Sequence, residues 1–413
     1  MTGPMLFLLA GLILGPEGAS LIDIGPNTDA VRVFAEVTLA LLLFSDASTV
    51  DASSLWRSHT GPVRLLAIAL PLAILFGAIA AIVVFADLSL GTAALIAAIL
   101  APTDLSLGLS MFKNPAVPAL VRRTLNVESG LNDGIASPFV TLFIALSISE
   151  VGSSSGSWLA EAVSEITIGL AAGVAVGVVG GYLIVLAKNH DWAADSSLPF
   201  AVFALAILSF VIASAMHGNG FIAAFVGGLA YRLVVRKAAH PTTEFAERTG
   251  TLMTFAVWAI FGAFAGTELL RSGFEWLPIA YALLSLFVVR MAAVAISLLG
   301  LKTRWETQIF AGWFGPRGLA SVVFLLTAYD ALSNAGANTA ILLSAVSWTI
   351  VLSVVLHGAS AGPVAAWYGK RVATFPEDAG ELAEVQLEQV PRRYTHWHGR
   401  DQRWKKAENG ERS

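Results

Sequence analysis

The segment Glu128-Ser129-Gly130-Leu131-Asn132-Asp133-Gly134 places two carboxylates and an amide inside an otherwise apolar stretch of the sequence. A charged side chain at the centre of a membrane helix costs about 2.5–3.5 kcal/mol on insertion scales, so such a residue normally marks an ion path or a proton relay. Ser129 and Asp133 are four residues apart and share one helical face, whereas Glu128 and Asn132 share a neighbouring face. The segment therefore predicts a membrane helix that presents one face to an ion and the other to neighbouring helices.

The composition supports a membrane protein. Of the 413 residues, 56% are hydrophobic and only 13% are charged, whereas a soluble domain carries roughly 25% charged residues. The mean hydropathy is +0.72. The absence of cysteine excludes disulfides, thiolate metal sites and thiol redox chemistry. No clustered basic face indicates a nucleic-acid partner. We therefore expect the lipid bilayer, monovalent cations and protons as partners, and no cofactor.

The apolar residues form long runs. A helix needs about 20 apolar residues to cross about 30 Å of hydrocarbon. About twelve such runs are present, centred near Leu9, Leu41, Leu75, Ile99, Val140, Val174, Leu205, Val226, Val257, Leu286, Val323 and Val351. The sequence therefore predicts about twelve transmembrane helices.

The loops between these runs differ in charge. Basic residues fall mainly on every second loop, at Arg57 and Arg64, at Lys113, Arg122 and Arg123, at Arg232, Arg236, Lys237 and Arg248, at Lys302 and Arg304, and at Lys370 and Arg371. Because basic loops stay on the cytoplasmic side, both termini are predicted to be cytoplasmic. We expect an all-α polytopic domain over residues 1–372 in the cell (inner) membrane, followed by a polar, flexible cytoplasmic tail over residues 373–413.

Two of the predicted helices are interrupted. The fourth contains Ala101-Pro102-Thr103-Asp104, and the eleventh contains Gly312-Trp313-Phe314-Gly315-Pro316-Arg317-Gly318. Proline removes a helical hydrogen bond and glycine lets the backbone unwind. Unwound backbone at membrane depth must be buried in protein or line an aqueous cavity. If helices 1–5 and 8–12 form two inverted five-helix repeats, the two broken helices correspond and cross, which is the layout of a transporter with its ion site at the crossing.

Four ionisable residues lie near the membrane midplane by residue counting. Asp133 is about ten residues from the basic loop, hence roughly 15 Å deep at 1.5 Å per residue. Asp104, Arg290 and Arg317 reach a similar depth from the loops next to them. Because these four residues come from four different helices, the pattern indicates an ion site rather than packing.

The residue types suggest a role for each charge. Glu128 is the expected structural partner of Arg290, because an unpaired buried charge of either sign is very costly. Asp133 is the best candidate for the exchangeable cation and proton site, and Asp104 is the next. Arg317 is expected to neutralise either the half-helix ends or Asp104.

Other polar residues are harder to place. Asp46 is either an acid of the ion cavity or part of the inner interface with Asp51, and the residues alone leave both open. We expect Glu36 to be an exposed or capping acid near the outer end of its helix. We expect His217 and His357, near membrane edges, to be surface residues.

These motifs resemble the cation/proton antiporter superfamily, specifically the sodium/proton exchanger branch with its NhaP-type members. The resemblance covers roughly Pro4 to Tyr368. Thr103-Asp104 looks like the Thr-Asp-Pro of the family's first broken helix, with Leu105 in place of the proline. The segment Glu128–Gly134 matches the Glu-Ser-x-x-Asn-Asp-Gly ion-site helix, and Gly312–Gly318 matches the second broken helix. The resemblance implies an NhaA/NhaP-like antiporter fold.

The resemblance also implies the site residues. Asp133 is expected to bind the cation and the proton alternately, with Na⁺ held by Asp133, Ser129, Asp104 and the backbone carbonyl of Thr103. Asp46 falls where many relatives have a glutamate near the ion, and Asp46 and Asn132 complete the expected cation/proton-binding residues.

The remaining family positions are implied to be structural or to set the stoichiometry. Asn132 is expected to favour electroneutral exchange of one cation for one proton. Glu128 and Arg290 match a structural ion pair of the family. The residues expected to support the breaks are Pro102, Gly315, Pro316 and Arg317.

The resemblance further implies a homodimer. NhaP-type relatives commonly have thirteen helices, and Met1-Thr2-Gly3-Pro4-Met5 looks like the start of the family's second helix. We therefore expect the counterpart of the first helix to be missing from this chain.

The function expected from the sequence is secondary transport that serves pH homeostasis, not enzymatic catalysis. Na⁺ (or Li⁺) would exchange for H⁺ by competition for one buried aspartate with alternating access. The alternative is a K⁺/H⁺ antiporter with the same site. A channel is disfavoured because no filter-like segment is present. An intramembrane aspartyl protease using Asp104 and Asp133 is a remote alternative, since the Tyr-Asp and Gly-x-Gly-Asp motifs that it would resemble are absent.

Overall fold

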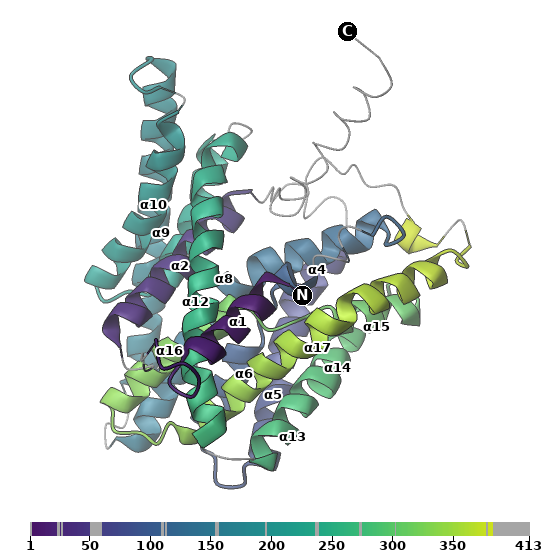
Figure 1. Ribbon diagram of the computed structural model, residues 1–413. Coiled ribbons are helices and arrows are strands. Elements are labelled where there is room, and N and C mark those ends of the chain that lie inside the picture. The colour runs from purple at the N-terminus through teal and green to yellow at the C-terminus, as the bar shows by residue number, and fades with distance from the viewer. Residues whose placement is uncertain are drawn as a thin grey trace.

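The computed structural model describes residues 2–22, 25, 28–49, 60–108, 111, 114–152, 157–194, 196–235, 239–271, 275–301, 303–376 and 379–382. These residues are almost entirely helical and contain no strand (Figure 1). The α-helices are α1 (Gly3–Leu14), α2 (Asp29–Thr49), α4 (Thr60–Arg64), α5 (Leu70–Val84), α6 (Leu90–Leu100), α8 (Ala119–Val151), α9 (Trp158–Asn189), α10 (Leu198–Ala215), α11 (Gly220–Val235), α12 (Ala239–Arg271), α13 (Trp276–Leu284), α14 (Arg290–Ser297), α15 (Trp305–Trp313), α16 (Leu319–Asn334) and α17 (Ala340–Val372). Short π-helical segments are η1 (Leu65–Ala69) and η4 (Ser285–Val289), and short 3₁₀ segments are η2 (Leu105–Gly108) and η5 (Gly380–Leu382).

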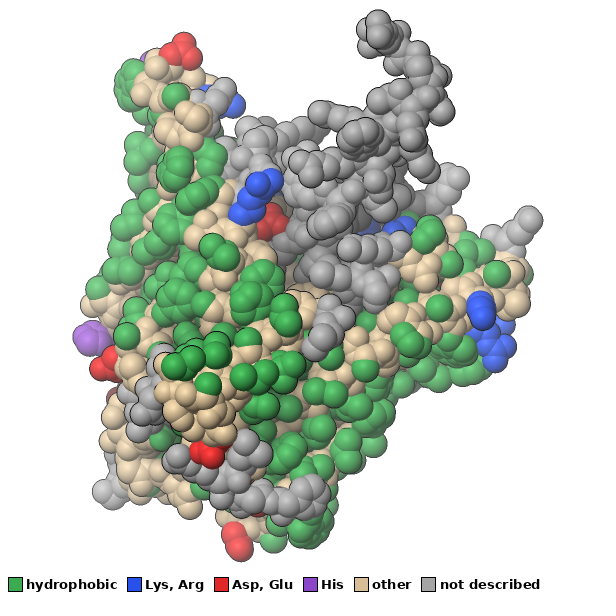
Figure 2. All heavy atoms as spheres, viewed as in Figure 1, with side chains coloured by type: hydrophobic (Ala, Val, Ile, Leu, Met, Phe, Trp, Pro, Cys, Tyr) green, Lys and Arg blue, Asp and Glu red, His purple; other side chains and the backbone are tan. Residues whose placement is uncertain are grey.

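The apolar runs of the sequence all become helices. Each of the twelve predicted centres lies in a helical segment. In the described residues, seven helical segments are long and apolar enough to cross a membrane, and four shorter helices are also apolar. Hydrophobic side chains are spread over much of the visible surface of the described residues, as expected for contact with lipid (Figure 2). The prediction of an all-helical, multi-pass membrane protein is confirmed.

The helices fall into two groups by their packing. The first, called the flanking bundle below, contains α1, α2 and α9–α12, in which α11 packs on α9 and α2, and α1 packs on α12. The second, called the site bundle, contains α4–α6, α8 and α13–α17, in which α6 packs on α5 and α8. Figure 1 shows α9 and α10 of the flanking bundle on one side and α14, α15 and α17 on the other. Helix α8 also contacts α2, α9 and α11, so it lies at the boundary between the bundles.

The two five-helix units predicted from the sequence, from α1 to α8 and from α11 to α17 without α9 and α10, share two irregularities. The third helix of each unit contains a five-residue π segment, at Leu65–Ala69 and at Ser285–Val289. The fourth helix of each unit is broken, between α6 and η2 and between α15 and α16. Two irregularities in the same order agree with the predicted repeats.

The predicted polar tail lies mostly outside the described residues, as do Arg57, Lys113, Arg236, Lys237 and Lys302. The first tail residues that are described fold back onto the membrane domain. Glu381 in η5 is buried and accepts hydrogen bonds from the backbone N–H of Arg304 (2.7 Å) and from Oγ1 of Thr307 (3.0 Å). Because these groups lie at the start of α15, the beginning of the tail caps the N-terminal end of a broken helix.

Candidate functional site

The two broken helices meet directly. Helix α6 ends at Leu100, and helical bonding resumes in η2 at Leu105. Helix α15 ends at Trp313, and α16 begins at Leu319. The backbone N–H of Asp104 in the first break donates to the carbonyl oxygen of Pro316 in the second, at 2.8 Å. This bond fixes the crossing of the two unwound segments inside the site bundle.

Side chains of the second broken helix cap the carbonyl end of the first. Oγ of Ser321 donates to the carbonyl of Ile99 (2.7 Å), and Nη1 of Arg317 donates to the carbonyl of Ala101 (3.3 Å). Arg317 is only 1% exposed. A cation at a helix C-terminus offsets the negative end of the helix dipole. Of the two roles expected for Arg317, the structure therefore shows the one at a half-helix end.

A chain of hydrogen bonds spans the second break. The backbone N–H of Arg317 donates to Oγ of Ser353 (2.8 Å), and this oxygen lies 3.3 Å from Nδ1 of His357. Nε2 of His357 lies 2.8 Å from the carbonyl oxygen of Trp313. Nδ1 of His357 lies closer still, at 2.9 Å, to the carbonyl oxygen of Ser353, so each ring nitrogen faces a backbone carbonyl and the ring connects α17 to residue 313.

The expectation that His357 lies at the surface is wrong. Its side chain is only 4% exposed and stacks on the ring of Trp313, with 4.6 Å between ring centroids. In the sequence, His357 falls within a long apolar run that gives no indication of which helix it faces. His217, by contrast, is exposed, as expected.

Glu128 and Arg290 form a buried ion pair. Nη1 of Arg290 lies 2.6 Å from Oε1 of Glu128, and Nη2 donates to Oε2 at 3.0 Å. Arg290 follows the π segment η4 directly. A Cβ built on Gly315 would lie 2.8 Å from Cζ of Arg290, so the pair packs against the second break at a position where only glycine fits. The pair thereby joins α8 to the broken helix without an uncompensated charge.

Asn132 and Ser129 tie α8 to the first break. Nδ2 of Asn132 donates to the carbonyl of Thr103 (3.2 Å) and to its Oγ1 (2.7 Å). Oγ of Ser129 donates to the same carbonyl (3.0 Å) and accepts from the backbone N–H of Leu105 (3.2 Å). Two expected cation ligands, the Ser129 hydroxyl and the Thr103 carbonyl, are therefore bonded to each other in this conformation.

The carboxylate of Asp104 lies at the start of η2, the short helical segment that follows the first break. Its Oδ1 accepts from the backbone N–H of Ser106 at 2.8 Å. A Cβ built on Gly318, which precedes α16, would overlap the Asp104 side chain. A carboxylate at a helix N-terminus is electrostatically favourable. Asp104 and Arg317 thus complement half-helix ends of opposite sign.

The three candidate ion-binding acids are less buried than the neighbouring ion pair. Asp133, Asp104 and Asp46 are partly exposed, whereas Glu128 and Arg290 are buried. A Cβ built on Gly130 would lie 4.0 Å from Cβ of Asp46, so Asp46 of α2 faces α8 beside the turn that carries Asp133. Of the two positions considered for Asp46, the structure places it opposite the ion-site helix.

The expectation for Glu36 is wrong. Its side chain is only 12% exposed and lies 3.8 Å from Nη1 of Arg32. Its Oε1 also accepts a hydrogen bond from Oγ1 of Thr327 in α16, at 3.3 Å. Glu36 therefore joins α2 of the flanking bundle to the site bundle, which spacing along one helix could not indicate.

The arrangement supplies oxygen donors for a hard monovalent cation at a boundary between two helix bundles. Asp133, Ser129, Asp104 and the Thr103 carbonyl all lie on α8 or the break that it contacts. Carboxylate, hydroxyl and carbonyl oxygens suit alkali cations.

Comparison with known proteins gives a consistent result. Over residues 1–367 the chain matches the family described as "Sodium/hydrogen exchanger, transmembrane". It is 29% identical over 354 residues to the Na(+)/H(+) antiporter NhaP of Pseudomonas aeruginosa, which covers 79% of this chain and 78% of that protein. It is 24% identical over 405 residues to the K(+)/H(+) antiporter NhaP of Alkalimonas amylolytica, covering 94% of this chain and 65% of that protein. Its fold is similar to that of the sodium proton antiporter MjNhaP1 from Methanocaldococcus jannaschii, with a TM-score of 0.70 at 23% identity over 89% of this chain and 92% of that chain.

Proposed function

Because the chain belongs to the sodium/hydrogen exchanger family, we propose that it exchanges Na⁺ or Li⁺ for H⁺ across the cell membrane. The observation that carries this proposal is the position of Asp133. It is a partly exposed carboxylate on α8, at the boundary of two bundles and next to the crossing of two broken helices.

The mechanism is competition between a proton and a cation for Asp133. Either ligand neutralises the carboxylate, and the two exclude each other because they occupy the same oxygen atoms. An empty, charged carboxylate is costly to move past an apolar barrier, so the bundles change position only when one ligand is bound. Exchange follows from this rule without a further energy source.

Cation binding rearranges the first break. In this conformation the Ser129 hydroxyl donates to the Thr103 carbonyl. A cation beside Asp133 would draw both oxygens towards itself, which requires this hydrogen bond to break. Asn132 keeps its bond to Oγ1 of Thr103 (2.7 Å) throughout and holds the unwound segment in place. Because Asn132 carries no charge, one titrating carboxylate gives exchange of one cation for one proton.

Two features of the proposal concern the whole protein. Both termini lie in the cytoplasm, because basic loops lie at the start of α8 and at the end of α17. The protein acts as a homodimer, which the family resemblance implies.

A K⁺/H⁺ antiporter is the second candidate. The relative from Alkalimonas amylolytica carries that name. The same site could serve K⁺, since the larger ion differs in the cage size that it needs rather than in ligand type.

The test is proton flux in everted membrane vesicles, with NaCl, LiCl or KCl added to a preformed pH gradient. We expect Na⁺ or Li⁺ to collapse the gradient with wild-type protein and not with Asp133→Asn. Asp191→Asn, an exposed aspartate at the end of α9, is the matched control and should behave as wild type. A response to KCl alone would favour the second candidate. Equal responses of wild type and Asp133→Asn would remove Asp133 from the mechanism.

A further inference from the structure

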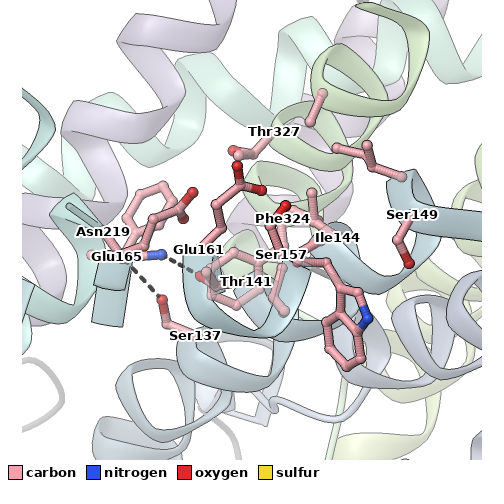
Figure 3. A pocket seen from close by; sticks show the side chains of 16 residues that line it. Ser137, Thr141, Ile144, Ser149, Ser157, Glu161, Glu165, Asn219, Phe324 and Thr327 are labelled. Carbon is pink, nitrogen blue, oxygen red and sulfur yellow. Dashed lines mark hydrogen bonds between the residues drawn. The ribbon is translucent and has the colours of Figure 1, made fainter. Parts of the chain in front are cut away.

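A cavity with a mixed polar and apolar lining lies along α8 beyond the ion-site segment. Its volume is about 270 Å³, and it is enclosed by α8, the start of α9, the start of α11 and α16 (Figure 3). Glu161 and Glu165 of α9 are exposed at its rim, whereas Ser137, Thr141 and Phe324 are buried at its floor. The cavity therefore leads from the surface towards the helix that carries Asp133.

Asn219 closes the floor of the cavity. Its Oδ1 accepts hydrogen bonds from Oγ of Ser137 (3.3 Å) and from the backbone N–H of Ile222 (2.9 Å). Its Nδ2 donates to Oγ1 of Thr141 at 2.5 Å, and Figure 3 shows both side-chain bonds. Asn219 precedes α11 in the flanking bundle, whereas Ser137 and Thr141 lie on α8 in the site bundle. The amide thus joins the two bundles at the point where the cavity ends.

Aromatic side chains of α11 complete the barrier. The ring of Phe221 packs edge-on against Phe324 of α16, with 5.7 Å between centroids. One turn further along α11, the ring of Phe225 occupies the place where a Cβ of Gly134 would lie. Ser137 is one helical turn, about 6 Å along the axis, from Asp133. The floor of the cavity at Ser137 is therefore about one helical turn from Asp133 along α8.

The backbone of α8 also offers an oxygen within this turn. Pro138 lies inside the helix and has no N–H to donate to the carbonyl of Gly134. That carbonyl follows Asp133 directly in the sequence. A cation leaving the carboxylate therefore has a backbone oxygen close at hand, and then the hydroxyl and amide oxygens of Ser137 and Asn219.

We propose that the cavity is the outer vestibule of the ion path and that Asn219 is the gate residue between this vestibule and Asp133. The inference rests on the proposed function, since it assumes that Asp133 is the transport site. When the two bundles move apart at this end, the bonds of Asn219 to Ser137 and Thr141 break and the path opens. Glu161 and Glu165 raise the local concentration of monovalent cations at the mouth.

The gate can be tested by thiol accessibility, because the chain contains no cysteine. Ala145→Cys places a reporter in the cavity, and Gly130→Cys places one beside Asp46, where a Cβ meets no close contact. A membrane-impermeant methanethiosulfonate is applied from outside. We expect Ala145→Cys to react in every background. Gly130→Cys should react slowly in the wild-type background and about tenfold faster or more with Asn219→Ala, since that change removes the bonds between the bundles.

A second variant keeps the test decisive if Asn219→Ala does not fold. Ser137→Ala with Thr141→Val removes the same bonds from the α8 side and should also accelerate labelling of Gly130→Cys. Ser149→Ala is the matched control, because Ser149 lines the same cavity but bonds only to the carbonyl of Leu146 in its own helix. It should leave the labelling rate unchanged.

The outcomes separate this inference from the proposed function. Unchanged labelling of Gly130→Cys in both gate variants, at normal folded yield, overturns the gate. Failure of external reagent to reach Ala145→Cys overturns the vestibule. Faster labelling in a protein that shows no cation-dependent proton flux supports the gate and contradicts the proposed function. In transport, Glu165→Gln should raise KM for the external cation with kcat unchanged, and an unchanged KM would contradict a role of the rim in concentrating cations.

Discussion

The break in the second broken helix is held together by single side chains of α17. Ser353 and His357 connect the backbone N–H of Arg317 to the carbonyl of Trp313 across the unwound residues. A hydrogen bond within a protein contributes about 0.5–1.5 kcal/mol to the free energy of unfolding. The geometry of the break therefore depends on two residues that lie outside the motif itself.

His357→Ala should lower both stability and transport. The change removes the imidazole from the Trp313 carbonyl, which keeps its hydrogen bond from the N–H of Gly315 (2.7 Å), and it removes the stacking on the Trp313 ring. We therefore expect a loss of about 0.5–1.5 kcal/mol in the free energy of unfolding. Thermal unfolding in detergent and proton flux in vesicles measure the two effects. His217→Ala, at an exposed position, is the control and should change neither. Wild-type behaviour of His357→Ala would show that the chain across the break is not needed.

Asn132→Asp should not convert the protein to electrogenic exchange. Asn132 donates through Nδ2 to two oxygens of Thr103, and a carboxylate has no donor to replace these bonds. In the variant, the carboxylate oxygens of residue 132 would face the carbonyl and hydroxyl oxygens of Thr103. Hydrogen bonds of about 1 kcal/mol each would be replaced by repulsion, so we expect the transport rate to fall at least about tenfold. Transport measured with and without an imposed membrane potential checks this. Fast, potential-dependent transport by the variant would contradict the structural role of Asn132.

At the scale of elements, the crossing is set by close approach of unwound backbone. The Asp104 N–H bonds to the Pro316 carbonyl, and the Asp104 side chain occupies the space beside Gly318. The paired π segments η1 and η4 lie in contact with the helices of the opposite repeat, η1 against α14 and η4 against α5. A π segment shifts the side chains that follow it relative to a regular helix. In η4 this shift precedes Arg290, the partner of Glu128.

Gly318→Ala should abolish transport. The added methyl group would overlap the side chain of Asp104 and force the two breaks apart. Gly362→Ala is the matched control, since Gly362 lies in α17 of the same bundle and a Cβ there meets nothing within 4 Å. We expect the control to retain wild-type flux and stability. Normal transport by Gly318→Ala would mean that the crossing tolerates a wider separation than the structure has.

At the scale of the whole molecule, two bundles are joined at the vestibule end by several polar contacts. Besides Asn219, Nη1 of Arg32 in α2 lies 3.3 Å from Oδ2 of Asp330 in α16. Thr327 of α16 donates to Glu36 of α2. These contacts cross the boundary that would have to open in the alternating access proposed above.

A cross-link at this boundary should stop transport. Arg32→Cys with Asp330→Cys, joined by a short bifunctional thiol reagent, ties α2 to α16 and prevents the bundles from separating. We expect flux to be lost on cross-linking and restored by reduction. Arg32→Cys with Asp29→Cys, on one helix three residues apart, is the control and should remain active when cross-linked. Full activity of the cross-linked Arg32–Asp330 pair would exclude movement at this boundary.

Much of the fold follows from local features of the sequence. Apolar runs of about 20 residues predict the membrane helices, because an exposed backbone polar group is not tolerated in lipid. The Pro102 and Gly315-Pro316 interruptions predict the breaks, because proline and glycine act on their own backbone. The pairing of Glu128 with Arg290 could also be expected, since buried charges of opposite sign at one depth need each other.

The sequence by itself determined the membrane class, the helix positions and the two breaks, and it predicts the residues that bind the ion. Only the tertiary structure decided that His357 is buried, that Glu36 is half-buried against α16, that Arg317 caps a half-helix, and that Asn219 joins two bundles. The physical reason is that these residues bond to partners distant in sequence or on other helices. Whether a polar side chain on an apolar helix meets lipid, water or a carbonyl depends on which helix packs against it. The tertiary packing of all the helices decides which ones are neighbours.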